Sequence, residues 1–377
     1  MEENGKKRKH MLLGLASFFL VAAAAYSIYW FGYGQYYQST DDTYVSGNLV
    51  QLMPQVTGNV VSVYADDTES VKAGQPLVKL DDTDAELALQ NAETTLAETV
   101  RSVRQLYSAA GELRAVVDER QAELAKARQD LDRRAKLYSR HAVSQEDLQH
   151  AKDNAAVAES ALASSEHKLA SALAAVENTT LSTHPAVLKA ETRLRQAWLD
   201  EERTVINAPA TGYVAKRSVQ IGQRVTPSST LMVIVPLDEI WVDANFKEDQ
   251  LRHIRIGQPV ALTSDIYGSN IVFHGKVAGL GAGTGAVFSL LPPQNATGNW
   301  IKVVQRLSVR IRLDPREVAR HPLRIGLSMV AKIDTHDESG GVLAKVQPEK
   351  PIYSTSVFEN RSDEAERMIA RILKENG

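Results

Sequence analysis

Two short stretches of the chain match each other without a gap, 154 residues apart. The first runs from Val56 to Leu80 and the second from Ala210 to Ile234. The identical residues fall on a glycine and on the alternating apolar positions that a strand-turn-strand unit needs; they are Thr57/Thr211, Gly58/Gly212, Val60/Val214, Val71/Val225 and Leu77/Leu231. Neither stretch can bury its apolar face alone, so we expect residues 53–82 and 205–236 to pair into one small β-sandwich. In this sandwich we expect four residues to form the turns and the core: Gly58, Val60, Gly212 and Val214.

The segment between the two halves, residues 83–204, has the pattern of a helical hairpin. Every seventh residue of its first part is apolar, which predicts a narrow seam supercoiled against a partner helix; the positions are Leu89, Leu96, Val103, Ala110, Val117, Leu124, Leu131 and Tyr138. Thr83 or Asp82 is expected to cap this helix, with Glu86 completing a capping box from Thr83. Charged side chains cover the other positions. We interpret them as a solvated face, with packing against another molecule as the alternative.

A second helix is predicted to begin near Ser144. The seven-residue period runs from Leu148 to Val176, breaks over 177–185 and resumes at Val187. That shift of phase predicts a stutter, and Pro185 predicts a kink there. Because the connection at 139–143 is short, the two helices should form an antiparallel hairpin with its tip at 137–144. The chain would then leave a small domain, travel far and return to complete it.

The amino terminus predicts a membrane anchor. A basic segment, residues 1–10, carries Lys6, Lys7, Arg8 and Lys9 and precedes an uncharged run over 11–33. As a helix, that run would extend roughly 35 Å, enough to cross a bilayer core. The basic cluster should remain on the cytoplasmic side, and everything after Gly34 should lie outside the cytoplasm. A cleaved signal peptide is the alternative, but its apolar region is normally shorter.

The rest of the chain is predicted from its strand and turn signals. Residues 34–52 are expected to form a membrane-proximal strand or linker. Residues 237–336 have short strands separated by glycine and proline turns, which favours a small antiparallel β-barrel. The polar tail, 337–377, ends in a helical pattern over 363–374 and is expected to be peripheral. The expected fold class is therefore mixed α and β, an elongated multidomain chain.

Composition argues against several classes of function. The 43 basic and 46 acidic residues give a formal charge of -3, whereas nucleic-acid binders usually have a strong basic excess. Cysteine is absent and the nine histidines are scattered, so no disulfide framework, thiolate site or paired zinc spacing is present in the sequence. We find no catalytic constellation, and we predict no enzyme activity, no cofactor and no metal.

The two half-motifs resemble the halves of a biotinyl/lipoyl carrier domain. In such carriers a modified lysine lies on the tight turn that joins the halves. Here the hairpin replaces that turn, and Lys79 lies inside a strand pattern. A carrier subunit of an acyl- or biotin-dependent enzyme is therefore an improbable alternative.

The combination of anchor, split lipoyl halves, hairpin and barrel resembles the periplasmic adaptors, or membrane fusion proteins, of tripartite efflux systems. The segments 40–45, 241–248 and 288–306 are similar to the EmrA-type branch, and the last of these is long and specific. The resemblance implies an adaptor in the bacterial inner membrane that links a major-facilitator-type drug/proton antiporter to a TolC-like outer-membrane channel. It implies a homo-oligomer as well. An adaptor of an ABC-driven protein secretion system shares the architecture and is the alternative.

The resemblance also suggests contact residues. Arg133, Leu137 and Ser144 match the Arg-Leu-Ser pattern that adaptor tips present to the outer-membrane channel. Ser144 with Asp147 is at the same time a good helix cap. In the segment 288–306 we expect barrel assembly or transporter contact, with five candidate residues: Phe288, Asn295, Gly298, Trp300 and Arg306.

Overall fold

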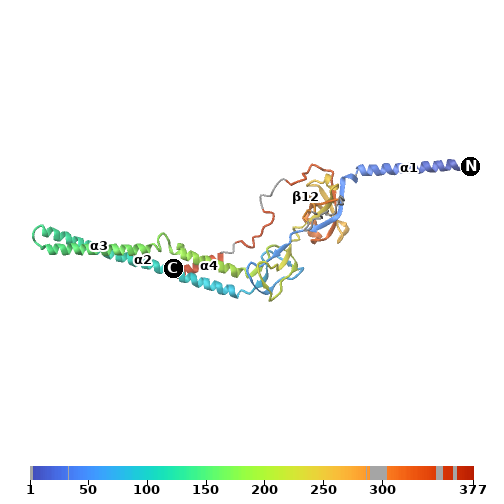
Figure 1. Cartoon of the computed structure of the whole chain (residues 1–377). Coiled ribbons are helices and arrows are strands. Elements are labelled where there is room, and N and C mark those ends of the chain that lie inside the picture. The colour runs from blue at the N-terminus through green and yellow to red at the C-terminus, as the bar shows by residue number, and fades with distance from the viewer. Residues whose placement is uncertain (1–2, 33, 286, 289–303, 345–350, 360–362) are drawn as a thin grey trace, which may run out of the picture.

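The protein is an elongated molecule with a helix at each extreme. A computed structural model describes residues 3–32, 34–285, 287–288, 304–344, 351–359 and 363–377. In Figure 1, helix α1 (Glu3–Gly32) projects at one end, and the helical hairpin of α2 (Thr83–Tyr138) and α3 (Gln145–Leu173) projects at the other. Two β-domains lie between them. The predicted fold class is confirmed.

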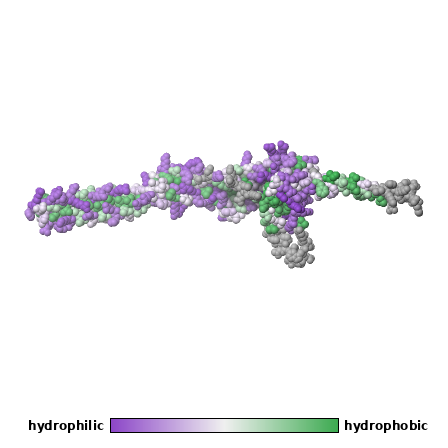
Figure 2. Space-filling model, turned by 90° about the horizontal axis from the view of Figure 1, so that it is seen from above, coloured by the Kyte–Doolittle hydropathy of each residue, from purple (hydrophilic) through white to green (hydrophobic). Residues whose placement is uncertain are grey.

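Helix α1 is long and apolar enough to cross a membrane. The candidate span covers 23 residues, Gly14–Tyr36, and none of its apolar window is buried inside the protein. In Figure 2 the coloured part of this helix is mostly hydrophobic, in contrast to the mostly hydrophilic surface of the hairpin. An exposed apolar helix of this length matches the thickness of a bilayer core. A short 3-10 turn, η1 (Gly34–Tyr36), then leads directly into the first strand.

That first strand belongs to the β-barrel. In the described residues, six antiparallel strands close in the order β1-β10-β13-β12-β11-β14; they are β1 (Tyr37–Ser46), β10 (Trp241–Lys247), β11 (Pro259–Ser264), β12 (Gly268–Leu280), β13 (Arg306–Leu313) and β14 (Ser328–Asp334). Two short helices, η3 (Gln250–His253) and α5 (Pro315–Arg320), complete the domain. The predicted barrel range, 237–336, therefore lacks one strand, β1. This strand lies in the predicted linker, 34–52, and it closes the barrel by pairing with both β10 and β14.

The two matched half-motifs form a single lipoyl-like sandwich. Its two four-stranded sheets have the orders β2-β9-β7-β4 and β6-β5-β3-β8, so each sheet takes strands from both halves. The strands are β2 (Val50–Leu52), β3 (Gly58–Val63), β4 (Ser70–Val71), β5 (Pro76–Leu80), β6 (Val205–Asn207), β7 (Gly212–Arg217), β8 (Arg224–Val225) and β9 (Met232–Val235). Val60 and Val214 are buried in the shared core.

The contacts between the halves repeat with the sequence offset. Gly58 pairs in register with Val225, and Val71 pairs with Gly212, the same contact in the two directions. The amide of Val60 donates to Gln223 O at 2.9 Å, and that of Val214 donates to Glu69 O at 2.9 Å. Even the left-handed turn residue recurs: Thr68 has φ +74° and its equivalent Gly222 has φ +81°. The two matching halves are thus related by a pseudo-twofold axis within one domain.

The hairpin seam follows the predicted heptads along most of α2. Leu89 and Leu131 are half-buried, Tyr138 is exposed at the tip, and the five positions between Leu89 and Leu131 are buried; they are Leu96, Val103, Ala110, Val117 and Leu124. The predicted capping box of Thr83 and Glu86 is wrong. Asp82 is the N-cap residue without a side-chain cap bond, and Asp81 accepts hydrogen bonds from the amide and the hydroxyl of Thr83 instead.

The predicted stutter is also wrong, because the second half of the hairpin is interrupted. Helix α3 ends at Leu173, a turn with η2 (Leu181–Thr183) follows, and α4 (Pro185–Glu202) begins anew. Asn178 has φ +57°, which a helix cannot contain, and His184 caps α4 with Pro185 at its first turn. The shift of the heptad phase between Val176 and Val187 is caused by the loop between α3 and α4.

The C-terminal pattern forms a packed helix, so the expectation of a peripheral tail is wrong for this part. Helix α6 (Asp363–Asn376) buries Ala365, Ile369 and Ile372. The two isoleucines join a core cluster with side chains of α2 and α4, among them Leu96 and Val187. The hairpin is therefore two helices thick toward the tip and three helices thick at its base. The sequence pattern fits this result, since 14 residues with an apolar stripe need a surface to cover it.

The pseudo-twofold predicts unequal effects of two equivalent substitutions. A Cβ at Gly212 would lie 2.5 Å from the backbone oxygen of Val235, whereas one at Gly58 would lie 3.2 Å from the Leu80 side chain. Gly212→Ala should therefore destabilise the sandwich by about 2 kcal/mol, and Gly58→Ala by roughly half that or less, since relieving a 2.5 Å contact needs a larger backbone shift than relieving a 3.2 Å contact. Amide hydrogen exchange of β3 and β7 measures the opening free energy. Equal losses in the two variants would contradict this difference in close approach.

Candidate functional site at the hairpin tip

The tip is a tight, hydrogen-bonded turn at the end of the molecule opposite α1. After α2 the chain reverses over residues 139–143, with His141 at φ +55°. The amide of Ala142 donates to Leu137 O at 3.0 Å, and that of Ser139 donates to Ala135 O at 3.2 Å. These bonds satisfy carbonyls that the end of a helix leaves free. The tip thus has a defined backbone shape.

Ser144 caps the returning helix. Its hydroxyl oxygen accepts from the Asp147 amide at 3.1 Å, while Asp147 Oδ2 accepts from the Ser144 amide at 3.2 Å and from its hydroxyl at 2.6 Å. This is the complete capping box, as predicted. The hydrogen bonds from Ser144 lower the pKa of Asp147 below its ordinary value. The carboxylate therefore remains charged in neutral solution.

The three residues of the Arg-Leu-Ser pattern lie together at the tip and face solvent. Arg133 is 71% exposed in its side chain and hydrogen-bonds to Asp130. Leu137, one turn further along α2, is 37% exposed. Ser144 is exposed as well, although its hydroxyl is engaged in the cap. An exposed leucine between a cation and a polar turn is a surface that a partner can cover.

Arg134 is a tip residue that the sequence reasoning missed. Its Nε donates to Asp130 Oδ2 at 2.8 Å, and its Nη1 lies 3.7 Å from Asp147 Oδ1 on the returning helix. Hydrogen bonds from Arg134, and then from Arg133, lower the pKa of Asp130. One guanidinium thus connects α2 to the capped start of α3. The spacing of four residues between Asp130 and Arg134 was the available signal.

The second set of candidates lies at the barrel. Phe288 is 73% exposed, in the connection that follows β12. Arg306 opens β13, pairs in register with Lys247 and forms an ion pair with Asp42 of β1. This ion pair connects β13 to β1 on the exposed surface of the barrel. Asn295, Gly298 and Trp300 lie outside the described residues.

The structure gives Lys79 a local role. It lies within β5, and its Nζ is 3.1 Å from Asp82 Oδ2. The hydrogen bond with Asp82 raises the Lys79 pKa. This lysine is not on the turn that a carrier domain would modify. Among the residues that the structure describes, no group of three or more histidine, aspartate or glutamate side chains could hold a metal ion.

The cap of α3 gives a local stability prediction. Ser144→Ala removes the acceptor of the capping box and should lower the opening free energy of the first turn of α3 by about 1 kcal/mol. Hydrogen exchange of the amides at 146–148 measures it, with Gln145→Ala, an exposed neighbour, as the control. Unchanged exchange in Ser144→Ala would show that the cap does not hold the tip.

Known proteins share the hairpin and the overall fold of this chain. The sequence profile described as "EMRA, alpha-helical hairpin domain" matches residues 83–204. The chain resembles the membrane fusion protein Spr0693 of Streptococcus pneumoniae in fold, with a TM-score of 0.50 at 15% identity, covering 80% of this chain and 99% of that one.

Full-length relatives decide the family. The chain is 49% identical over 330 residues to the fatty acid resistance protein FarA of Neisseria gonorrhoeae, covering 87% of this chain and 84% of that relative. It is 45% identical over 354 residues to the multidrug export protein EmrA of Escherichia coli strain K12, covering 94% and 91%. At this identity over nearly its whole length, the chain belongs to the EmrA family of membrane fusion proteins, the periplasmic adaptors.

Proposed function

We propose that the protein is the periplasmic adaptor of a multidrug efflux pump that exports toxic hydrophobic compounds. The observation that carries this function is the arrangement of one chain with a membrane-length helix at one extreme and an exposed hairpin tip at the other. As a member of its family, the chain is a transport component and not an enzyme. Relatives that are named for multidrug export and for fatty acid resistance support the substrate class.

The orientation of the anchor follows from its charges. Lys6, Lys7, Arg8 and Lys9 precede the apolar span, and basic segments stay on the cytoplasmic side of a membrane. The bulk of the chain would then lie in the periplasm, with α1 crossing the inner membrane once. Helix α2 alone has 56 residues, which corresponds to about 84 Å of reach. This length supports a bridge between two membranes.

Two ends of the molecule suit two different partners. At the inner membrane the partner would be a major-facilitator-type drug/proton antiporter, which supplies the energy. At the hairpin tip it would be a TolC-like outer-membrane channel, with Arg133, Leu137 and Ser144 as the contact. Several copies of the chain would surround the path between them as a homo-oligomer.

The connection after β12 is our candidate for the transporter contact. It leaves the barrel at Leu280 and returns at Arg306, whose strand neighbour Lys247 lies at the end of β10. Gln250, just beyond β10, donates to Ser39 O in β1, close to where that strand leaves α1. The connection therefore starts on the membrane side of the barrel. Phe288 offers an exposed aromatic side chain there, the kind of residue that dominates protein interfaces.

Substitution of the tip leucine tests the channel contact. Leu137→Asp leaves the capping box intact but puts a charge where an apolar contact is expected, and it should weaken channel binding by about 2 kcal/mol, roughly thirtyfold. Ser144→Arg should have a similar effect. Co-purification of the channel and drug resistance are the readouts. The matched control is Val157→Asp on the shaft of α3, where Val157 is 69% exposed.

The outcomes separate docking from capping. Docking predicts that Leu137→Asp, in which the cap is intact, loses most of the channel binding. Ser144→Ala removes the cap and only one of the three proposed contact groups, so it should retain most of the binding. If Leu137→Asp and Ser144→Arg both keep channel and resistance, the tip is not the docking site.

Substitution of Phe288 tests the transporter contact independently. Phe288→Ala should reduce co-purification of the inner-membrane transporter while the channel still binds the tip. Ile266→Ala, which alters an exposed apolar residue between β11 and β12, should change neither. Retained transporter in Phe288→Ala would remove this residue from the interface.

A further inference from the structure

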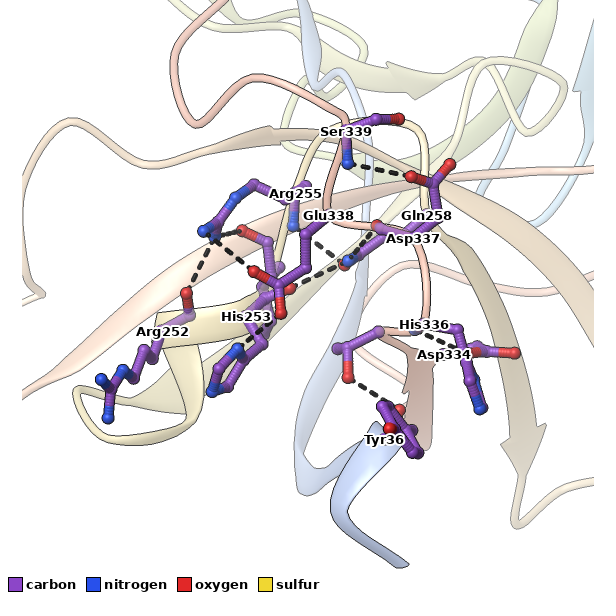
Figure 3. Close-up of polar contacts among 12 residues, drawn as sticks. Tyr36, Arg252, His253, Arg255, Gln258, Asp334, His336, Asp337, Glu338 and Ser339 are labelled. Atoms are coloured by element: carbon purple, nitrogen blue, oxygen red, sulfur yellow. Dashed lines mark hydrogen bonds and ion pairs between the residues drawn. The ribbon is translucent and has the colours of Figure 1, made fainter. Parts of the chain in front are cut away.

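The C-terminal segment begins at the exit of the membrane helix. The amide and the hydroxyl of Thr335 both donate to Tyr36 O, at 2.8 and 2.7 Å. The next ring, His336, stacks on Tyr36 with centroids 4.2 Å apart. Figure 3 shows these groups gathered where η1 meets the end of β14. The start of the segment is therefore fixed to the root of the anchor.

The following residues are bound to the barrel. Glu338 Oε1 is hydrogen-bonded to His253 Nδ1 at 2.7 Å, and its Oε2 forms an ion pair with Arg255 Nη2 at 3.6 Å. Gln258, only 3% exposed, donates from Nε2 to Asp337 O at 2.8 Å and to His253 O at 2.9 Å. Figure 3 shows this network between the η3 region and residues 337–339. A buried amide that bonds two backbone segments holds them in one arrangement.

Further along, the segment crosses from the barrel to the sandwich. Ile352 and Tyr353 line a cavity of about 680 Å³ together with Tyr213 of the sandwich and Trp241 of the barrel. The hydroxyl of Thr355 donates to Pro209 O at 2.7 Å, just before β7. Residues 351–359 are therefore bonded to the sandwich and lie beside the cavity between the two β-domains.

The segment ends as α6 on the base of the hairpin. Ile369 and Ile372 pack into one cluster with α2 and α4 side chains. Arg195 of α4 holds Glu366 by two bonds, Nε to Oε1 at 2.6 Å and Nη2 to Oε2 at 3.1 Å. Arg371 adds an ion pair with Glu93 of α2 at 3.6 Å. A bidentate arginine fixes orientation as well as position.

Docking and folding of α6 are coupled. A helix of 14 residues is marginal in water by itself, so α6 depends on the surface that it covers. Without α6, the apolar side chains that it covers on α2 and α4 would face solvent. The docked state is consequently favoured for both partners.

The C-terminal segment adds a third connection between domains that the chain otherwise connects twice. The chain passes between barrel and sandwich at 47–49 and 236–240, and between sandwich and hairpin at 81–82 and 203–204. Two crossings leave a domain free to bend about the line that joins them, and domains linked in this way move by default. A third attachment away from that line restricts the bending.

We propose that the C-terminal segment is an intramolecular clamp, in which docking of α6 on the hairpin base fixes the direction of the hairpin relative to the barrel and the membrane anchor. The clamp is a property of the isolated chain and does not depend on the identity of its transporter or channel. It would set where the tip points before any partner binds.

The absence of cysteine makes the test direct. Nitroxide labels at Ser269→Cys in the barrel and Ser102→Cys in α2, both exposed positions, report the distance distribution between the two domains in the full chain in nanodiscs. Ile369→Asp with Ile372→Asp should undock α6, abolish the amide protection of residues 365–376 and broaden the distribution. Ala370→Asp, the same kind of change on the exposed face of α6, should alter neither measurement. A chain that ends at residue 360 should reproduce the broadened distribution.

Two results would overturn the clamp. One is an unchanged distance distribution in the chain that ends at residue 360, since α6 is then certainly missing. The other comes from Glu93→Cys with Arg371→Cys treated with a short bis-maleimide. An intramolecular clamp gives a cross-linked monomer, whereas a ladder of linked copies would place α6 on a neighbouring molecule.

Discussion

The structure depends on the backbone pairing between two half-motifs that lie 154 residues apart in the sequence. Gly58 with Val225 and Val71 with Gly212 are the same contact seen from the two sides of a pseudo-twofold axis. Because each sheet of the sandwich takes strands from both halves, neither half is complete alone. The pairing brings Leu80 and Val205 onto neighbouring strands β5 and β6, and this fixes both roots of the hairpin on one sheet. The helical hairpin therefore extends from this sheet.

The barrel is likewise completed by strands that are far apart in the sequence. β1 precedes the sandwich in sequence, yet it closes a barrel whose other described strands follow the sandwich. The chain thus opens two domains on its way out and completes both on its way back. Its last segment returns a third time, as α6 on the hairpin base. Such nesting places the anchor, the barrel, the sandwich and the hairpin one after another along an elongated molecule (Figure 1).

Much of this was predictable because the signals are local and periodic. The seven-residue spacing from Leu89 to Leu131 specified the seam of α2, and Ser144 with Asp147 specified the start of α3. The apolar run after Lys9 specified α1. The errors occurred where a pattern allows two local solutions or where a tertiary contact decides. A heptad shift between Val176 and Val187 fits a stutter as well as a loop, and only Asn178 at positive φ with a new cap at His184 shows that the helix ends. Arg134 was missed because its second partner, Asp147, is on the other helix.

The sequence by itself determined the elements of this protein: an apolar span, two matching half-domains, heptad helices and a capped tip. Each follows from a spacing that the backbone geometry translates directly into a buried face. Only the tertiary structure decided where β1 and α6 belong. Their apolar faces show that they need partners, but a strand edge or a helical groove accepts many sequences of the right period. The choice among those partners is made by the global arrangement: the edges of β10 and β14 that β1 must close, and the groove of Leu96 and Val187 that α6 must cover.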